Sequence, residues 1–79
     1  MTEQQRREIL VETVKTFGQQ EWFRDAVIYD SHPLTGQPTL EFKVNYVPVF
    51  RMKDVKEFVD RYRLTDKMVV VDKQGKPAE

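Results

Sequence analysis

The stretch TLEFKVNYV, residues 39–47, decides the fold because its side chains alternate between apolar and polar. The apolar positions are Leu40, Phe42, Val44 and Tyr46, and the polar positions are Glu41, Lys43 and Asn45. Successive side chains of a β-strand point to opposite faces of a sheet, so the pattern predicts a strand with one buried and one hydrated face. Pro48 cannot donate a backbone hydrogen bond to a neighbouring strand, so it marks the end or the edge of this strand.

The chain begins with a predicted helix. Thr2 followed by Gln5 fits a capping box, in which each side chain satisfies a free backbone N–H of the other residue. We predict a helix from about Glu3 to Phe17, and Gly18 fits a left-handed residue that would end it. The apolar stripe of this helix is expected at Leu10, Val14 and Phe17, with Ile9 beside it.

A further strand is expected before the loop that precedes residue 39. We predict it over residues 22–30, WFRDAVIYD, with apolar side chains on both of its sides. One side, the tryptophan set, is Trp22, Ala26 and Ile28; the other, the tyrosine set, is Phe23, Val27 and Tyr29. Prolines and a glycine in the intervening loop are typical of a turn, so the two strands are expected to form an antiparallel hairpin.

The length of that loop decides which apolar set faces the core, and two registers remain open. A two-residue turn at residues 35–36 pairs Val27 with Val44 and turns the tyrosine set inward. A change of one residue in loop length pairs Ile28 with Phe42 instead and turns the tryptophan set inward. The pattern of apolar residues favours neither register.

Two more elements follow Pro48. Apolar residues recur at helical spacing over residues 52–63 and charged residues fill the other face, which predicts an amphipathic helix. KMVVVD, residues 67–72, is a short apolar run typical of a strand covered on both faces, so we expect it to be central in the sheet or parallel to its neighbour. A helical crossover of this length makes the strand parallel to residues 39–47, with right-handed connectivity. The apolar stripe of the helix is expected at Met52, Val55, Phe58, Val59 and Tyr62.

Together these elements predict an α+β domain with the order helix, strand, strand, helix, strand, a mixed three-stranded sheet and both helices on one face. The 79-residue chain has the length of one domain, which we place at residues 1–72, and the polar tail at 73–79 is expected to be disordered. The absence of cysteine excludes disulfides and thiolate metal sites. No apolar run approaches the ~20 residues that span a bilayer and no signal peptide is recognisable, so we expect a cytoplasmic protein without membrane contact.

Few residues could support catalysis. His32 is the only histidine, and as a general base it would need a second positioned group, for which Asp30 is the nearest candidate. The surrounding DSHP is also made of ordinary turn residues, which favours a structural turn. No P-loop, dinucleotide fingerprint, nucleophile elbow or calcium loop is present, so we expect neither an enzyme nor a cofactor or metal site.

The apolar character of both sides of residues 22–30 is the main functional signal. Whichever set faces the core, the other lies on the sheet face away from the helices, where an uncovered apolar strip indicates a contact site. We therefore expect a non-enzymatic protein-interaction domain, either a homodimer or a small adaptor or inhibitor, with Trp22 or Phe23 as its anchor. The predicted partner-binding residues are Trp22, Phe23, Ala26, Ile28 and Tyr29.

YVPVFRMKD, residues 46–54, leads to the alternative function, a nucleic-acid-binding module. Its cations lie where a helix begins, and the free N–H groups and the dipole of a helix N-terminus favour an anion. The simpler interpretation is that Val47, Val49 and Phe50 close the end of the core. Thirteen basic residues are balanced by thirteen acidic ones, without the concentrated basic footprint of a backbone-binding protein. The candidate anion-binding and nucleic-acid-binding residues are Arg51, Lys53, Lys56 and Lys67.

The order of the elements is similar to the type II KH arrangement of some RNA-binding domains, with one helix fewer. It is also similar to a ferredoxin-like fold without its first strand. The backbone-clamping GXXG loop of the KH family is absent, because the only glycines are Gly18, Gly36 and Gly75. The resemblance covers the order of elements and no motif, so it implies no site residue.

Overall fold

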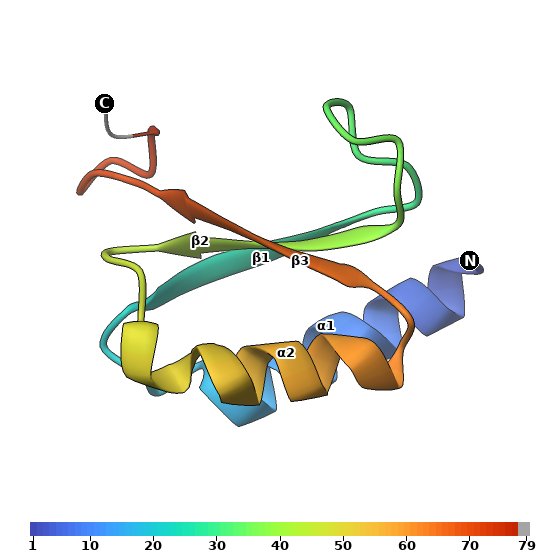
Figure 1. Ribbon diagram of the computed structural model, residues 1–79, viewed down its shortest axis with the longest axis horizontal. Helices are drawn as coiled ribbons and strands as arrows, with labels where there is room; N and C mark the ends of the chain where they lie inside the picture. The colour runs from blue at the N-terminus through green and yellow to red at the C-terminus, as the bar shows by residue number, and fades with distance from the viewer. Residues whose placement is uncertain (78–79) are drawn as a thin grey trace.

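The computed structural model describes residues 1–77 and shows two helices and a three-stranded sheet (Figure 1). The elements follow one another in the predicted order, so the α+β class is confirmed. Their bounds are α1 Glu3–Phe17, β1 Phe23–Tyr29, β2 Thr39–Val44, the short 3-10 helix η1 Val49–Arg51, α2 Met52–Arg61 and β3 Thr65–Val70.

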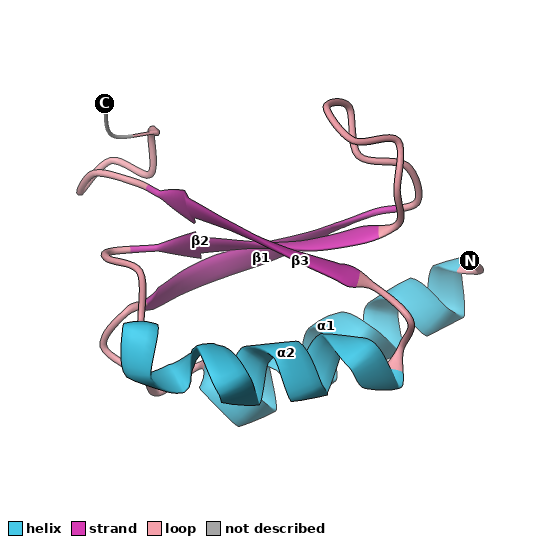
Figure 2. Cartoon of the chain, viewed as in Figure 1, coloured by secondary structure: helices cyan, strands magenta, loops and turns pink. Residues whose placement is uncertain are grey.

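Both helices cover one face of the sheet, while the β1–β2 loop and the C-terminal segment rise from its other side (Figure 2). β2 is the central strand, with β1 antiparallel on one side and β3 parallel on the other. Leu40, Phe42 and Val44 of β2 are fully buried between the sheet and the helices. The hydrophobic core consists of Ile9, Phe17, Trp22, Ile28, Leu40, Phe42, Val44, Val55, Phe58, Val59 and Leu64.

Flanking residues determine both ends of α1. Thr2 Oγ1 accepts a hydrogen bond from the N–H of Gln5 and Gln5 Oε1 accepts one from the N–H of Thr2, so the predicted capping box is confirmed. The helix ends at Phe17 as predicted, but Gly18 has φ of −62°, so the predicted left-handed cap is wrong. A glycine suits this position for another reason, because a Cβ there would collide with the carbonyl oxygen of Val14.

The buried face of α1 differs from the predicted stripe. Ile9, Thr13 and Phe17 are buried, Leu10 is partly buried, and Val14 is exposed. Thr13 can be buried because its hydroxyl donates to the carbonyl of Ile9 at 2.7 Å within the helix. The spacing of apolar residues alone therefore misplaced this face.

The β1–β2 hairpin has a register that neither predicted alternative describes. Ala26 pairs with Phe42 and Ile28 with Leu40, two residues away from the pairing of the second alternative. Because a shift of two residues leaves every side chain on the same face, Ala26 and Ile28 still point toward the helices, as that alternative predicts.

The loop at residues 30–38 explains this register. His32 donates its backbone N–H to the carbonyl of Gln37 at 2.9 Å, and Gly36 donates to the carbonyl of His32 at 2.7 Å. Gly36 has φ of +72°, a left-handed conformation that favours glycine. The turn therefore extends over residues 32–37. The hairpin is centred one residue earlier than in the second alternative, so each residue of β1 pairs with a residue of β2 that lies two positions earlier.

A bulge near the start of β1 changes the side on which Phe23 lies. The register shifts between Phe23 and Asp25, and Phe23 pairs with Val44. Because of the extra residue in β1, a side chain before the bulge points to the opposite sheet face from the one that regular alternation would give it. Phe23 therefore packs on the core side against Phe42, with ring centroids 6.3 Å apart, and is separated from the rest of the tyrosine set.

α2 and β3 complete the fold. α2 ends at Arg61, two residues before the predicted end. Val55, Phe58 and Val59 of the predicted stripe are buried, and Met52 and Tyr62 at its two ends are partly buried. β3 is parallel to β2 as predicted, but it is an edge strand rather than a central one. None of its residues is buried, because a neighbouring strand covers only one of its sides.

The segment after β3 turns back on itself. Val71 and Pro77 form an isolated antiparallel bridge, and the N–H of Asp72 donates to the carbonyl of Lys76 at 2.7 Å. Asp72 Oδ1 accepts further backbone hydrogen bonds within the turn. The described part of the predicted tail therefore forms a hydrogen-bonded turn, and the rest of that tail, residues 78–79, lies outside the described residues.

Candidate protein-interaction surface

Most of the predicted partner-binding residues lie in the core, so the predicted surface is wrong. Trp22 is 3% exposed and Ile28 is buried, while Phe23 and Ala26 are partly buried and pack against the same core. Of the five residues, Tyr29 alone lies on the outer face of the sheet, where it is partly buried. The hairpin register directs Ala26 and Ile28 toward the helices, and the bulge turns Phe23 to the same side. Trp22 lies in the turn before β1, where its ring packs against Phe17 and Phe42.

The outer face of the sheet carries mixed charges rather than an apolar strip. Opposite charges neighbour each other across the strands, Glu41 beside Lys67 and Asp25 beside Lys43. This face therefore offers little continuous apolar area. Its cross-strand rows are Tyr29–Thr39–Thr65, Val27–Glu41–Lys67 and Asp25–Lys43–Val69.

His32 folds over one end of this outer face. It is 5% exposed, and its Nε2 lies 3.1 Å from Oε1 of Glu41, which is also buried. Its Nδ1 accepts a hydrogen bond from the N–H of Leu34 at 3.1 Å, so in the neutral ring the proton lies on Nε2 and is donated to the carboxylate. Both ring nitrogens are thus used within the fold, where they hold the loop on the sheet.

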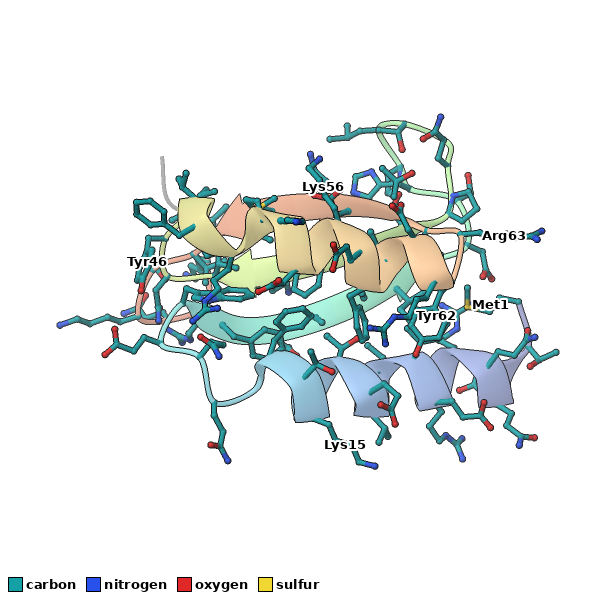
Figure 3. The ribbon with its side chains drawn as sticks, turned by 60° about the horizontal axis from the view of Figure 1, so that its bottom comes forward. Met1, Lys15, Tyr46, Lys56, Tyr62 and Arg63 are labelled. Atoms are coloured by element: carbon teal, nitrogen blue, oxygen red, sulfur yellow. The ribbon has the colours of Figure 1, made fainter. Side chains whose placement is uncertain are left out.

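Apolar side chains gather instead on the connection between β2 and α2. We call residues 46–50, YVPVF, the Phe50 segment; Tyr46 marks its place at one end of the molecule in Figure 3. Phe50 is 99% exposed and Val49 is 72% exposed, and Tyr46 and Val47 are exposed as well. Single exposed apolar residues are ordinary on a protein surface, whereas four exposed apolar residues within five positions are a local concentration of apolar side chains.

The backbone of the Phe50 segment is held by the fold. Pro48 is buried, whereas Val47, Val49 and Phe50 are exposed. The prediction that these three residues close the end of the core is therefore wrong. The carbonyl of Pro48 accepts a hydrogen bond from the N–H of Arg51 at 2.8 Å, and the N–H of Val49 donates to the carbonyl of Val47 at 2.9 Å. These bonds form η1 and its entry, which present the ring of Phe50 to solvent.

The sequence carries a signal for this surface. In YVPVF the apolar residues neither alternate as in a strand nor recur as in a helix, so no regular element can bury them all. A proline between a strand and a helix also limits how the segment can fold back on the core. Apolar residues without either period, beside a proline, therefore indicate an exposed patch as readily as a core plug.

Two of the predicted nucleic-acid-binding cations are paired with carboxylates. Arg51 Nη1 lies 3.6 Å from Asp54 Oδ2, and Lys56 Nζ lies 4.0 Å from Asp66 Oδ1. Lys56 projects from the side of α2 that faces away from α1 (Figure 3). The remaining two cations are Lys53, exposed on α2, and Lys67, on the outer face of β3. The four residues are therefore divided between the helix layer and the outer sheet face.

Within residues 1–77, no group of three His, Asp or Glu side chains lies close enough together to hold a metal ion. Neither described helix is long and apolar enough to cross a membrane. Comparison of the chain with protein-family models, with curated proteins and with solved structures finds no match in any of the three.

Proposed function

We propose that this protein is a small non-enzymatic protein-interaction domain that binds its partner through the Phe50 segment. The observation that carries the proposal is the 99% exposure of Phe50. A phenylalanine ring that enters a partner's pocket buries ~150–200 Å², which contributes about 2–3 kcal/mol to binding. Val49 and Tyr46 supply neighbouring apolar area, as expected around an aromatic anchor.

The order of the segment favours binding. Association costs free energy when a loop must become ordered at the interface. Here Pro48 is already buried, and its carbonyl accepts a hydrogen bond from the N–H of Arg51. The backbone that carries Phe50 is therefore ordered before a partner binds. The exposed Arg51–Asp54 pair lies directly beside the apolar residues and supplies the polar rim that protein interfaces usually have.

Site-specific photo-crosslinking in the cells from which the gene comes tests this proposal. A photoreactive benzoylphenylalanine replaces Phe50 in one variant and Leu34 in a control variant. Leu34 is a matched control because it is also an exposed apolar residue, at 79%, but lies in the β1–β2 loop. We expect discrete protein adducts from position 50 and none from position 34. Equal adducts from both positions, or none from position 50, would contradict the proposal.

Two further measurements identify the class of partner. Sedimentation of the purified protein over a range of concentrations shows whether the partner is a second copy of the chain. Gel-shift titration with RNA and DNA oligomers at two salt concentrations tests the alternative function, because backbone contacts weaken steeply as salt rises. Salt-sensitive nucleic-acid binding that is unchanged by Phe50→Ser would replace the proposed function with the alternative.

A further inference from the structure

The outer edge of β3 carries backbone groups that the rest of the fold does not use. Thr65 donates its N–H to the carbonyl of Pro38 at 2.9 Å. Alternate residues of a parallel strand bond to the same neighbour, so Asp66 and Met68 direct their N–H and C=O groups away from β2. These groups form no hydrogen bond within residues 1–77. β3 lies nearest the viewer in Figure 1, and no other described element crosses in front of it.

The other edge of the sheet is closed by side chains. On β1, Asp25 Oδ1 accepts a hydrogen bond from the N–H of Ala26 at 2.8 Å. Arg6 of α1 reaches the same strand and donates from Nη1 to the carbonyl of Ile28 at 3.0 Å. Proteins commonly protect an edge strand, because unpaired backbone groups pair readily with another chain. The difference between the two edges indicates that β3 is the one to which a further strand can add.

The chain itself shows that an antiparallel segment can lie along this edge. Asp72 belongs to the same outward-facing series of residues, and its N–H donates to the carbonyl of Lys76 at 2.7 Å. Beside it, Val71 and Pro77 form an isolated antiparallel bridge. The protein therefore already adds one antiparallel pair directly beyond the end of β3.

A second copy of the chain fits this edge poorly. Symmetric pairing of two β3 strands must bond outward-facing residues to each other. Bonding Asp66 to Met68 of the second copy sets the two copies of Lys67 opposite each other, and bonding Asp66 to its own copy sets two carboxylates opposite each other. Bonding Met68 to its own copy sets Thr65 against Val71, whose neighbour there is already Pro77. The occupant is therefore better sought in a different protein.

The charge of Lys67 indicates what that strand carries. Lys67 lies on the outer face of the sheet and forms no ion pair within residues 1–77, and its neighbour across β2, Glu41, is hydrogen-bonded to His32 instead. Because Lys67 bonds to β2, an added antiparallel strand meets it in a non-hydrogen-bonded pair, in which facing side chains lie closest. On the helix side of the edge, Met68 is partly buried against the core and offers apolar surface.

We propose that β3 binds an extended segment of a different protein as an added antiparallel strand, with an acidic residue of that segment opposite Lys67. The two residues that flank the acidic one exchange backbone hydrogen bonds with Asp66 and Met68, and the residue opposite Met68 is apolar. This edge shares no residue with the Phe50 segment, so the proposal goes beyond the proposed function and does not depend on it.

NMR titration of the intact chain with a synthetic peptide provides the test. The probe is acetyl-Thr-Val-Glu-Thr-Thr-amide, in which valine can face Met68 and glutamate can face Lys67. One control peptide has lysine in place of glutamate, and a second has N-methyl groups on the backbone nitrogens of the two residues that flank glutamate. We expect the probe to shift the amide peaks of Asp66 and Met68 saturably, while the peak of Gly36 in the β1–β2 loop stays in place. The lysine peptide should bind at least about threefold more weakly, and the N-methylated peptide should not bind.

A variant tests the part played by charge. Lys67→Gln removes the charge without placing a second carboxylate beside Glu41, and the backbone peaks of the same spectrum verify its fold. In this variant we expect the glutamate and lysine peptides to bind within about twofold of each other. Amide peaks of Asp66 and Met68 that do not move, equal binding of the N-methylated peptide, or a preference that persists in Lys67→Gln would each overturn the proposal. Amide peaks at this edge that move with protein concentration in the absence of peptide would overturn it as well, because they would assign the edge to a second copy. Failure of crosslinking at position 50 beside an intact peptide response would reject the Phe50 surface alone.

Discussion

The two connections that flank β2 are opposite in composition and in burial. The β1–β2 loop is mostly polar, yet its His32 is 5% exposed and is hydrogen-bonded through both ring nitrogens. The β2–α2 connection is mostly apolar, yet its Phe50 is 99% exposed. Residue type alone would predict the reverse. The contrast indicates that the first connection stabilises the fold, whereas the apolar side chains of the second are available to a partner.

The largest expected effect on stability comes from His32→Ala. This change leaves the buried carboxylate of Glu41 without its donor and also removes the acceptor of the Leu34 N–H. We expect the free energy of unfolding to fall by about 2–3 kcal/mol, measured by urea denaturation. Glu41→Gln is the control, because its amide oxygen can still accept from Nε2, and it should cost clearly less. A loss below ~0.5 kcal/mol for His32→Ala would show that the loop does not stabilise the fold.

Gly36→Ala tests the same loop through its backbone. Gly36 has φ of +72° and nothing lies within 4 Å of the place where a Cβ would stand, so the cost is conformational rather than steric crowding. We expect a loss of about 1 kcal/mol, seen as a lower urea midpoint with an unchanged slope. A neutral substitution would mean that the turn over residues 32–37 can relax, and the contrast between the two connections would weaken.

The smallest expected effect on stability comes from Phe50→Ser. The ring has almost no contact with the rest of the protein, so its removal should change the free energy of unfolding by no more than ~0.5 kcal/mol. Thermal and urea denaturation measure this, with Leu34→Ser as a matched exposed control. A loss above ~1 kcal/mol would place the ring in the core and remove the basis for a free binding surface.

The elements of this fold were predictable because their signals are local. The capping box of Thr2 and Gln5, the alternation over residues 39–44 and the helical stripe around Phe58 each depend on neighbours a few residues apart. Element order and the parallel third strand followed from these signals and from the length of the crossover.

The candidate site was not predictable because it depends on non-local geometry. The hairpin register follows from backbone bonds of His32 inside its loop, and the bulge next to Phe23 has no marker in the sequence. Together they turned Phe23, Ala26 and Ile28 toward the core, and Trp22 is buried beside them from the turn before β1. Exposure of Phe50 depends on where Pro48 packs, which is also a tertiary property. The apolar residues of the β2–α2 connection were noted in the sequence, but the side on which they lie was not encoded by their spacing.

The most direct test of the central claim is the affinity of the partner captured at position 50 for three purified proteins: wild type, Phe50→Ser and Leu34→Ser. Isothermal titration calorimetry gives all three dissociation constants under one set of conditions. We expect Phe50→Ser to weaken binding by at least about tenfold, as for an aromatic anchor, and Leu34→Ser to stay within about twofold of wild type, since surface changes away from an interface have small effects. Equal affinities of the three proteins, or a larger loss for Leu34→Ser, would contradict the claim that the exposed β2–α2 connection is the binding surface.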